Sequence, residues 1–225
     1  MIELDNIYNM DCLEGMQMLK EQGIKAAWII TDPPYGISAD DDHRANTQYG
    51  KALCKSKQYG KKEWDKKRPE KKYFDLMRDI SSNQIIFGGN YFADYLPPSN
   101  CWIVWDKETG DNFYADCELA WTSLPSAVRI CRYQWKGMLQ GNMKHKEERV
   151  HPTQKPLPVM EWILNKYTKE GGLVIDPFIG SGTTAVACHK LKRHYIGFEL
   201  DKEYYDIASK RIEQEKNKLT FFDLI

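Results

Sequence analysis

The sequence predicts an open α/β fold, in which a mainly parallel sheet carries helices on both faces. Three observations predict it. Short apolar runs rich in Ile, Val and aromatic residues recur along the chain of 225 residues, as buried parallel strands require. Turn-forming residues flank these runs, and helical patterns lie between several of them. Strands and helices therefore alternate along the chain.

Each expected element follows from its own pattern. Apolar residues at helical spacing predict helices over Leu13 to Leu19 and over Val159 to Tyr167. Tyr205, Ala208 and Ile212 mark the apolar face of a last helix. The expected strands are Ala26 to Ile30, Gln84 to Phe87, Trp102 to Trp105, Cys117 to Trp121, Leu173 to Ile175 and Tyr195 to Phe198.

Two polar segments interrupt the alternation. Ser38 to Glu70 is rich in Lys, and with the two residues that follow it forms a basic insert, residues 38–72, expected to be a mobile loop with some helix. Lys136 to Arg149 contains Gly137 and Gly141 and is also expected to be a loop. Both segments follow predicted strands, where loops commonly contact ligands.

The formal net charge is zero, but positive charge is concentrated in two places. Lys51 to Lys72 holds ten Lys or Arg against three acidic residues, and Arg129 to Arg149 holds six against two. Basic segments on a neutral protein suit a polyanion such as nucleic acid. A solvated charged surface would give the same pattern, so charge alone leaves both interpretations open.

Composition is that of one soluble domain spanning residues 1–225, with 42% hydrophobic and 28% charged residues. No apolar run approaches the ~20 residues that a membrane span needs. The acidic N-terminus does not resemble a secretory signal, so a cytoplasmic protein is expected. The six cysteines form no C-x-x-C pair and the five histidines do not cluster, so no metal site is expected.

The first candidate site is the turn Asp32-Pro33-Pro34-Tyr35, which follows the strand predicted at Ala26 to Ile30. Two prolines stiffen this turn and remove two backbone donors, so Asp32 is held just beyond the strand's carboxyl end, where open α/β sheets bind ligands. There a carboxylate and the Pro33 carbonyl can accept from an aromatic NH2 group and direct its lone pair at an electrophile. Tyr35 can stack on a base, worth ~1–3 kcal/mol, once that base has been flipped out of a duplex. A rigid turn whose Asp only caps another element is the alternative.

The second candidate site is the segment Leu173 to Thr184, which predicts a strand, a glycine-rich turn and the start of a helix. Gly180 and Gly182 allow a ligand to approach the backbone, and the helix N-terminus suits a carboxylate or phosphate. Glu199 ends the next strand and can accept from both hydroxyls of a ribose. The glycine spacing also fits a dinucleotide fingerprint, so a nicotinamide-dependent enzyme is a rival. The Asp-Pro-Phe before the glycines and the Asp32 to Tyr35 turn disfavour that rival.

Together these motifs resemble those of the DNA amino-methyltransferases, which modify adenine N6 or cytosine N4. Asp32 to Tyr35 is similar to their catalytic motif, and Asp176-Pro177-Phe178-x-Gly180-Ser181-Gly182-Thr183-Thr184 is similar to their cofactor loop. His151 to Pro156 resembles the segment that leads into this loop in the beta group, where the catalytic motif precedes the cofactor motif, as here. The resemblance implies methyl transfer from S-adenosylmethionine to a flipped-out adenine in DNA. Adenine is implied because the family prefers Asp at the first catalytic position; cytosine N4, an RNA substrate or a non-catalytic binding protein remain alternatives.

The resemblance also implies a circularly permuted, seven-stranded Rossmann-like methyltransferase fold, with a strand at Ile7-Tyr8 third in the usual order. Asp11 would then lie beside Glu199 and accept from the cofactor's adenine, unless it is only a helix N-cap. Thr153 and Lys155 would reach the methionine end. The implied catalytic residues are Asp32, Pro33, Pro34 and Tyr35. The implied cofactor-binding residues are Asp11, Cys12, Asp32, Thr153, Lys155, Asp176, Phe178, Gly180, Ser181, Gly182, Thr183, Thr184, Glu199 and Leu200.

Contacts to DNA are expected from three regions. Trp121 is a candidate second stacking face for the flipped base, with a place in the core as the alternative. Residues 122–150 leave room only for a short recognition loop, with Arg129, Arg132 and Lys136 as candidate contacts. Specificity would therefore be low, come from the 38–72 insert, or need a second subunit, since homodimers are frequent in the beta group. The absence of a nuclease motif suggests a stand-alone methylase.

Overall fold

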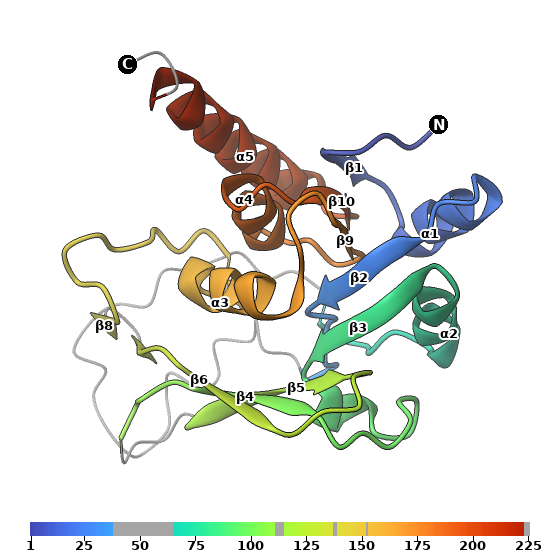
Figure 1. The fold of residues 1–225 in the computed structure, drawn as a ribbon, viewed down its shortest axis with the longest axis horizontal. Helices are drawn as coiled ribbons and strands as arrows, with labels where there is room; N and C mark the ends of the chain where they lie inside the picture. The colour runs from blue at the N-terminus through green and yellow to red at the C-terminus, as the bar shows by residue number, and fades with distance from the viewer. Residues whose placement is uncertain (38–64, 111–114, 137–138, 152, 223–225) are drawn as a thin grey trace.

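The computed structural model describes residues 1–37, 65–110, 115–136, 139–151 and 153–222 of the chain. Eight strands form one sheet in the order β1-β10-β9-β2-β3-β5-β4-β6, with helices on both faces (Figure 1). All neighbouring pairs are parallel except β3–β5 and β5–β4. The strands are β1 (Asn6–Asn9), β2 (Ala26–Thr31), β3 (Ser81–Phe87), β4 (Trp102–Asp106), β5 (Cys117–Thr122), β6 (Arg129–Arg132), β9 (Leu173–Asp176) and β10 (His194–Glu199).

The strand order confirms the predicted circular permutation. β1, from the start of the chain, pairs in parallel with β10, near its end, with Asn9 opposite Glu199. β2 pairs with β9 at Trp28 and Ile29, so the two halves of the chain meet inside the sheet. The sheet has one strand more than the seven expected, because Arg129–Arg132 adds to the edge beside β4.

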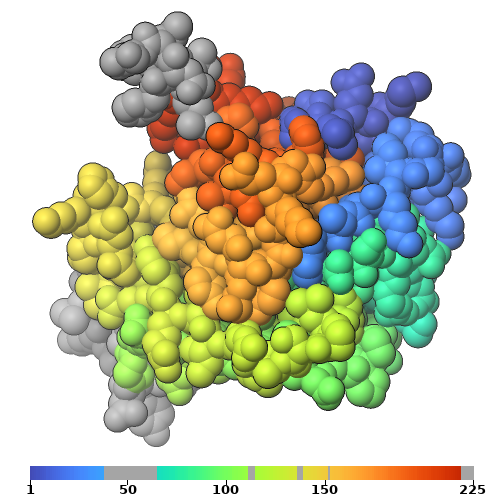
Figure 2. Space-filling model, viewed as in Figure 1, coloured from blue at the N-terminus to red at the C-terminus, as the bar shows by residue number. Residues whose placement is uncertain are grey.

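Helices cover the two faces of the sheet separately. On one face lie α1 (Cys12–Glu21), α2 (Lys71–Asp79) and the 3-10 turn η2 (Gly89–Phe92), and on the other lie α3 (Leu157–Tyr167), α4 (Thr183–Lys190) and α5 (Lys202–Phe222) (Figure 1). On the face seen in Figure 2, α3 lies between the C-terminal helices and the strands near β6.

Two hydrophobic cores result, one on each face, because successive residues of a strand point to opposite sides. In β3, Ile85 and Phe87 pack toward α3 and α4, whereas Ile86 packs toward α1 and α2. Both sides of the central strands are buried, which explains why their sequences are continuous apolar runs.

Two sequence expectations need correction. In α5 the buried face is Tyr204, Ala208 and Ile212, so Tyr204 and not Tyr205 faces the core. The segment after Lys136 is not all loop, because β8 (Leu139–Gln140) pairs with β7 (Trp135–Lys136) and the Gln140 side chain bonds the backbone of Glu147 at 2.8 and 2.9 Å. Among the described residues, no helix has the length and apolar character to cross a membrane.

Gly15 sets how closely α1 approaches the sheet. A Cβ at this position would lie well inside van der Waals contact with the Phe198 ring on β10. Gly→Ala inside an open helix stabilises by roughly 0.5–1 kcal/mol. We expect Gly15→Ala to lower the free energy of unfolding instead, by about 1–3 kcal/mol, because the clash outweighs helix propensity. Urea denaturation tests this, with Gln17→Ala on the exposed face of α1 as control; a stabilised Gly15→Ala protein would contradict it.

Candidate active site

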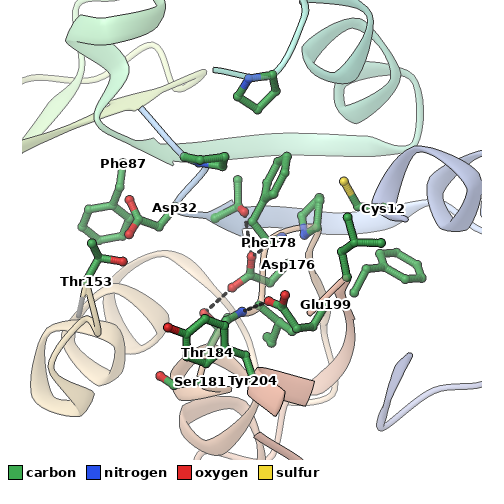
Figure 3. Close-up of a pocket in the computed structure, with 18 of the residues that line it drawn as sticks. Cys12, Asp32, Phe87, Thr153, Asp176, Phe178, Ser181, Thr184, Glu199 and Tyr204 are labelled. Atoms are coloured by element: carbon green, nitrogen blue, oxygen red, sulfur yellow. Dashed lines mark hydrogen bonds between the residues drawn. The ribbon is translucent and has the colours of Figure 1, made fainter. Parts of the chain in front are cut away.

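One cavity of about 420 Å³ opens where four parallel strands end. The residues just after β1, β2, β9 and β10 all line it (Figure 3). β9 and β2 are neighbours whose connections leave in opposite directions, so the cavity lies at the switch point where open α/β sheets bind ligands. In Figure 3, Asp32, Phe87 and Thr153 lie at one end, Glu199 and Cys12 at the other, and Asp176 and Phe178 between them.

Asp176 joins the ends of β9, β2 and α4. Its Oδ1 accepts from the Thr31 hydroxyl at 2.6 Å and from the Phe178 backbone N–H at 3.1 Å, and its Oδ2 accepts from the Thr184 hydroxyl at 2.6 Å. Burial raises the pKa of Asp176 to about 6, although these hydrogen bonds favour the charged form. The carboxylate therefore fixes the shape of the loop that follows β9.

Glu199 binds two backbone N–H groups in the cavity wall, one in the glycine loop and one just after β10. Its Oε2 accepts from the Gly180 backbone N–H at 3.0 Å and its Oε1 from the Asp201 N–H at 2.8 Å. Gly180 has φ +52°, a conformation that favours glycine. Burial raises the pKa of Glu199 to about 7. Asp11 lines the same end of the cavity and also caps α1 through the Leu13 N–H at 2.7 Å, so both of its predicted roles are compatible with the geometry.

Gly182 does not do what the glycine motif suggested. Among the residues predicted to bind a cofactor, it is the one that does not line the cavity. A Cβ there would lie 3.0 Å from the Ala208 Cβ, and its φ is +79°. Gly182 therefore allows α4 to pack against α5, and it shapes the turn without facing the ligand.

Asp32 sits in a chain of four charged side chains at the other end of the cavity. Its Oδ1 accepts from the Tyr35 hydroxyl at 2.5 Å, and its Oδ2 accepts from the Lys155 ammonium. Lys155 also pairs with Glu118 on β5 at 3.1 Å, and Glu118 pairs with Lys107 at 2.6 Å. Glu118 lies on β5 and Lys107 directly follows β4, so the spacing of these residues in the sequence does not predict their contacts with Lys155 and with each other.

Burial and neighbouring opposite charges act in opposite directions on the pKa values of Asp32, Lys155 and Glu118. Burial raises the pKa of Asp32, against the pull of Lys155. Burial would lower the pKa of Lys155, but Asp32 and Glu118 outweigh it and raise that pKa. Burial likewise opposes ionisation of Glu118, yet Lys155 and Lys107 hold the pKa of Glu118 below its ordinary value. Acidic and basic side chains thus alternate along the chain, and neighbouring charges favour the ionised forms of Lys155 and Glu118.

The aromatic residues near Asp32 differ from expectation. Tyr35 stacks on Tyr91, with ring centroids 4.6 Å apart and planes 16° apart, so one of its faces is covered. Its ring also packs so closely on Gly88 that a Cβ there would overlap it. The prediction that Trp121 offers a stacking face is wrong for this structure. Trp121 is 2% exposed and packs in the core on the α1–α2 side of the sheet, with its indole N–H donating to the Pro97 carbonyl at 2.9 Å.

The candidate DNA contacts lie at the sheet edge, away from the residues that line the cavity. Arg129 and Arg132 are exposed on β6, and Arg132 is 3.6 Å from Asp106. Lys136 belongs to β7, and its side chain lies outside the described part of the structure. The basic insert falls mostly on residues 38–64, which are also outside the described residues. Its described end contributes Lys67, Arg68, Pro69 and Glu70 to the cavity wall, within a segment from which ligand contacts were expected.

The remaining cavity wall comes from the segment before α3. Thr153 and Lys155 line the cavity, as does His151, whose ring lies 4.1 Å from that of Tyr204 on α5. Pro34 lines it too, whereas Pro33 is buried. No group of His, Cys, Asp and Glu among the described residues could hold a metal ion.

Comparison with known proteins adds an independent line of evidence. The N6/N4 methyltransferase family model, described as DNA methylase, matches residues 90–210, more than half of the chain. Type II methyltransferase M.HpaI of Haemophilus parainfluenzae is 27% identical over 95% of this chain and 76% of its own length. M.HindIII of Haemophilus influenzae is 26% identical over 95% of this chain and 97% of its own length. M2.DpnII of Streptococcus pneumoniae is 46% identical over 36% of this chain, and the match spans only 32% of that protein.

Solved structures share the fold. M1.HpyAVI in its complex with SAM superposes with a TM-score of 0.59 at 22% identity, covering 92% of this chain and 98% of that one. The cytosine-N4-specific PvuII DNA methyltransferase superposes with a TM-score of 0.58 at 14% identity. The superposition covers 94% of this chain and 90% of that one. These structures confirm the predicted α/β architecture.

The pKa of Glu199 predicts a pH-dependent loss of stability. Because its folded pKa is about 7 and its ordinary value is 4.5, the unfolded chain ionises first as pH rises. Stability is therefore lost between about pH 4.5 and 7. We expect wild type to lose roughly 1–3 kcal/mol relative to Glu199→Gln between these pH values. Urea denaturation at both ends of the range measures it, with exposed Glu203→Gln as control; equal pH dependence in wild type and Glu199→Gln would exclude this role.

Proposed function

Because the chain belongs to the N6/N4 family of DNA methylases, we propose that it transfers a methyl group from S-adenosylmethionine to the exocyclic N6 of adenine in DNA. The family uses S-adenosylmethionine, which confirms the cofactor expected from the sequence and removes the nicotinamide alternative. One observation carries the proposal of methyl transfer at this site. The Asp32 turn and the glycine loop, far apart in the sequence, open into the same cavity.

The cavity residues fit S-adenosylmethionine. Both oxygens of the Glu199 carboxylate already hold backbone N–H groups, and their remaining lone pairs can accept from ribose hydroxyls. Phe178 offers an apolar ring between the two ends of the cavity. Thr153 and Ser181 supply hydroxyl groups for the amino-acid end. When bound, the cofactor supplies an electrophilic methyl group on a sulfonium.

The chemistry that we assign to this chain is positioning. Asp32 and the Pro33 carbonyl accept from the adenine NH2 group and turn its lone pair toward the methyl. The Tyr35 hydroxyl, 2.5 Å from Asp32 Oδ1, fixes the carboxylate. No base is required before attack, because the nitrogen loses its proton after it has gained the methyl. Orientation and placed acceptors then provide most of the rate enhancement.

The stacking arrangement constrains how a base can enter. Tyr91 covers one face of Tyr35 and is itself 39% exposed. A base that stacks on Tyr35 from this side has to displace Tyr91, whose backbone carbonyl accepts from Arg68 at 2.8 Å. We assign the exposed Arg129 and Arg132 to phosphate contacts, since such contacts need no base recognition. A homodimer stays a prediction.

The proposal is tested by incubating the protein with DNA and labelled S-adenosylmethionine, then digesting the product to nucleosides. We expect N6-methyladenine; N4-methylcytosine, or methylation of RNA alone, would contradict adenine specificity. Asp32→Ala should lower transfer by about 10²-fold or more, because it removes a placed charge acceptor. Cofactor binding, measured by calorimetry, should survive in Asp32→Ala. Wild-type rates in that variant would exclude Asp32 as the catalytic acceptor.

A second prediction concerns the glycine loop. Gly180→Asp should abolish S-adenosylmethionine binding, because the side chain enters the cavity beside Glu199 and strains a backbone at φ +52°. Gly171→Asp is a matched control. Gly171 has φ +71°, no heavy atom would lie within 4 Å of its Cβ, and it does not line the cavity. Calorimetric titration should show binding lost in Gly180→Asp and kept in Gly171→Asp; equal affinities would show that the loop does not hold the cofactor.

A further inference from the structure

The chain of charges behind Asp32 is not accounted for by cofactor binding. Lys155 lines the cavity, yet its ammonium contacts two carboxylates, Asp32 and Glu118. Glu118 and Lys107 do not line the cavity. All four side chains are partly buried, with exposed fractions of 20% for Asp32, 10% for Lys155, 24% for Glu118 and 17% for Lys107. Their burial needs a reason, because isolated charges at such positions are costly.

The geometry gives Lys155 one fixed place. Its ammonium lies 5.2 Å from the centroid of the Phe87 ring and 5.9 Å from that of Tyr35. Glu118 on β5, which does not line the cavity, pairs with this ammonium at 3.1 Å. Lys107 neutralises the second oxygen of Glu118 at 2.6 Å. With its partners fixed in this way, Lys155 is directed at Asp32 Oδ2.

We propose that Lys155 and Glu118 are positioning residues for methyl transfer: Lys155 keeps Asp32 ionised, and Glu118 holds Lys155 in place. This inference rests on the proposed function. A protonated Asp32 would lose acceptor capacity toward an incoming amino group. An ionised Asp32 keeps a free lone pair on each oxygen beside Tyr35 and Lys155, and its negative charge stabilises the positive charge that develops on the attacking nitrogen.

Removing the charge of Lys155 and removing the charge of Glu118 should shift the pKa of Asp32 in opposite directions. Without Lys155, Asp32 loses a neighbouring cation, so its pKa rises. Without the charge of Glu118, Asp32 loses a neighbouring anion while Lys155 remains, so its pKa falls. A purely structural role would reduce the rate in both variants without displacing the pH profile in opposite directions.

The experiment is the pH dependence of single-turnover methyl transfer, at saturating S-adenosylmethionine, for the full-length protein. We expect the acid limb of Lys155→Met to move up by about 1–3 pH units, with about a tenfold lower rate per unit below the limb. Glu118→Gln should move the limb down, and Lys155→Arg should restore a profile near wild type. Lys190→Met is the control, since it breaks an ion pair with Glu161 of 2.5 Å outside the cavity.

The outcomes separate this inference from the proposed function. If wild type transfers no methyl group, the proposed function fails. If wild type is active and the limb of Lys155→Met stays in place or moves with that of Glu118→Gln, the inference is overturned. Should circular dichroism show Lys155→Met unfolded, Lys155→Gln replaces it. A Glu118→Gln limb that does not move down also overturns the inference.

Discussion

The active cavity depends on one buried carboxylate. Asp176 ends β9 and binds Thr31 at the end of β2 and Thr184 at the start of α4. Thr31 lies one residue before Asp32, so the carboxylate that shapes the glycine loop also fixes where the Asp32 turn leaves the sheet. A carboxylate buried at this depth is tolerated because three donors satisfy it. The strand ends are thereby held in register at the place where the two halves of the chain meet.

From this junction the two ends of the cavity acquire different electrostatic characters. Around Glu199, carboxylate oxygens accept from backbone N–H groups, and burial is the largest cause that raises the carboxyl pKa, with the charges of Asp201 and Asp176 adding to it. Around Asp32, a row of alternating charges keeps carboxylates and ammonium groups paired. Among the described residues, no group of His, Cys, Asp and Glu is placed to hold a metal ion. The site is thus built from hydrogen-bond acceptors in fixed places.

The sequence predicted the elements whose signals are local. Apolar runs such as that of β2 identify central strands because both faces are buried, and glycines with an acid at the next strand end identify a nucleotide-binding turn. α2 was not predicted because Lys71, Lys72 and other charged residues dominate its sequence, although its Phe74 and Met77 are buried. Trp121 was misjudged because alternation in β5 shows that neighbouring side chains diverge, but not which face meets a cavity. The Lys155–Glu118 contact depends on two distant segments meeting, which no spacing in the sequence encodes.

The pairing of β1 with β10 has a consequence for the order of folding. Asn9 and Glu199 are opposite each other, and the Asn9 side chain donates to the Glu199 carbonyl at 2.8 Å. During synthesis the first strand therefore has no partner until nearly all of the domain has left the ribosome, and closing so long a loop is slow. The cavity wall contains Asp11 from one end of this pairing and Glu199 from the other. The part of the cavity wall that contains Asp11 and Glu199 is therefore complete only once β1 has paired with β10.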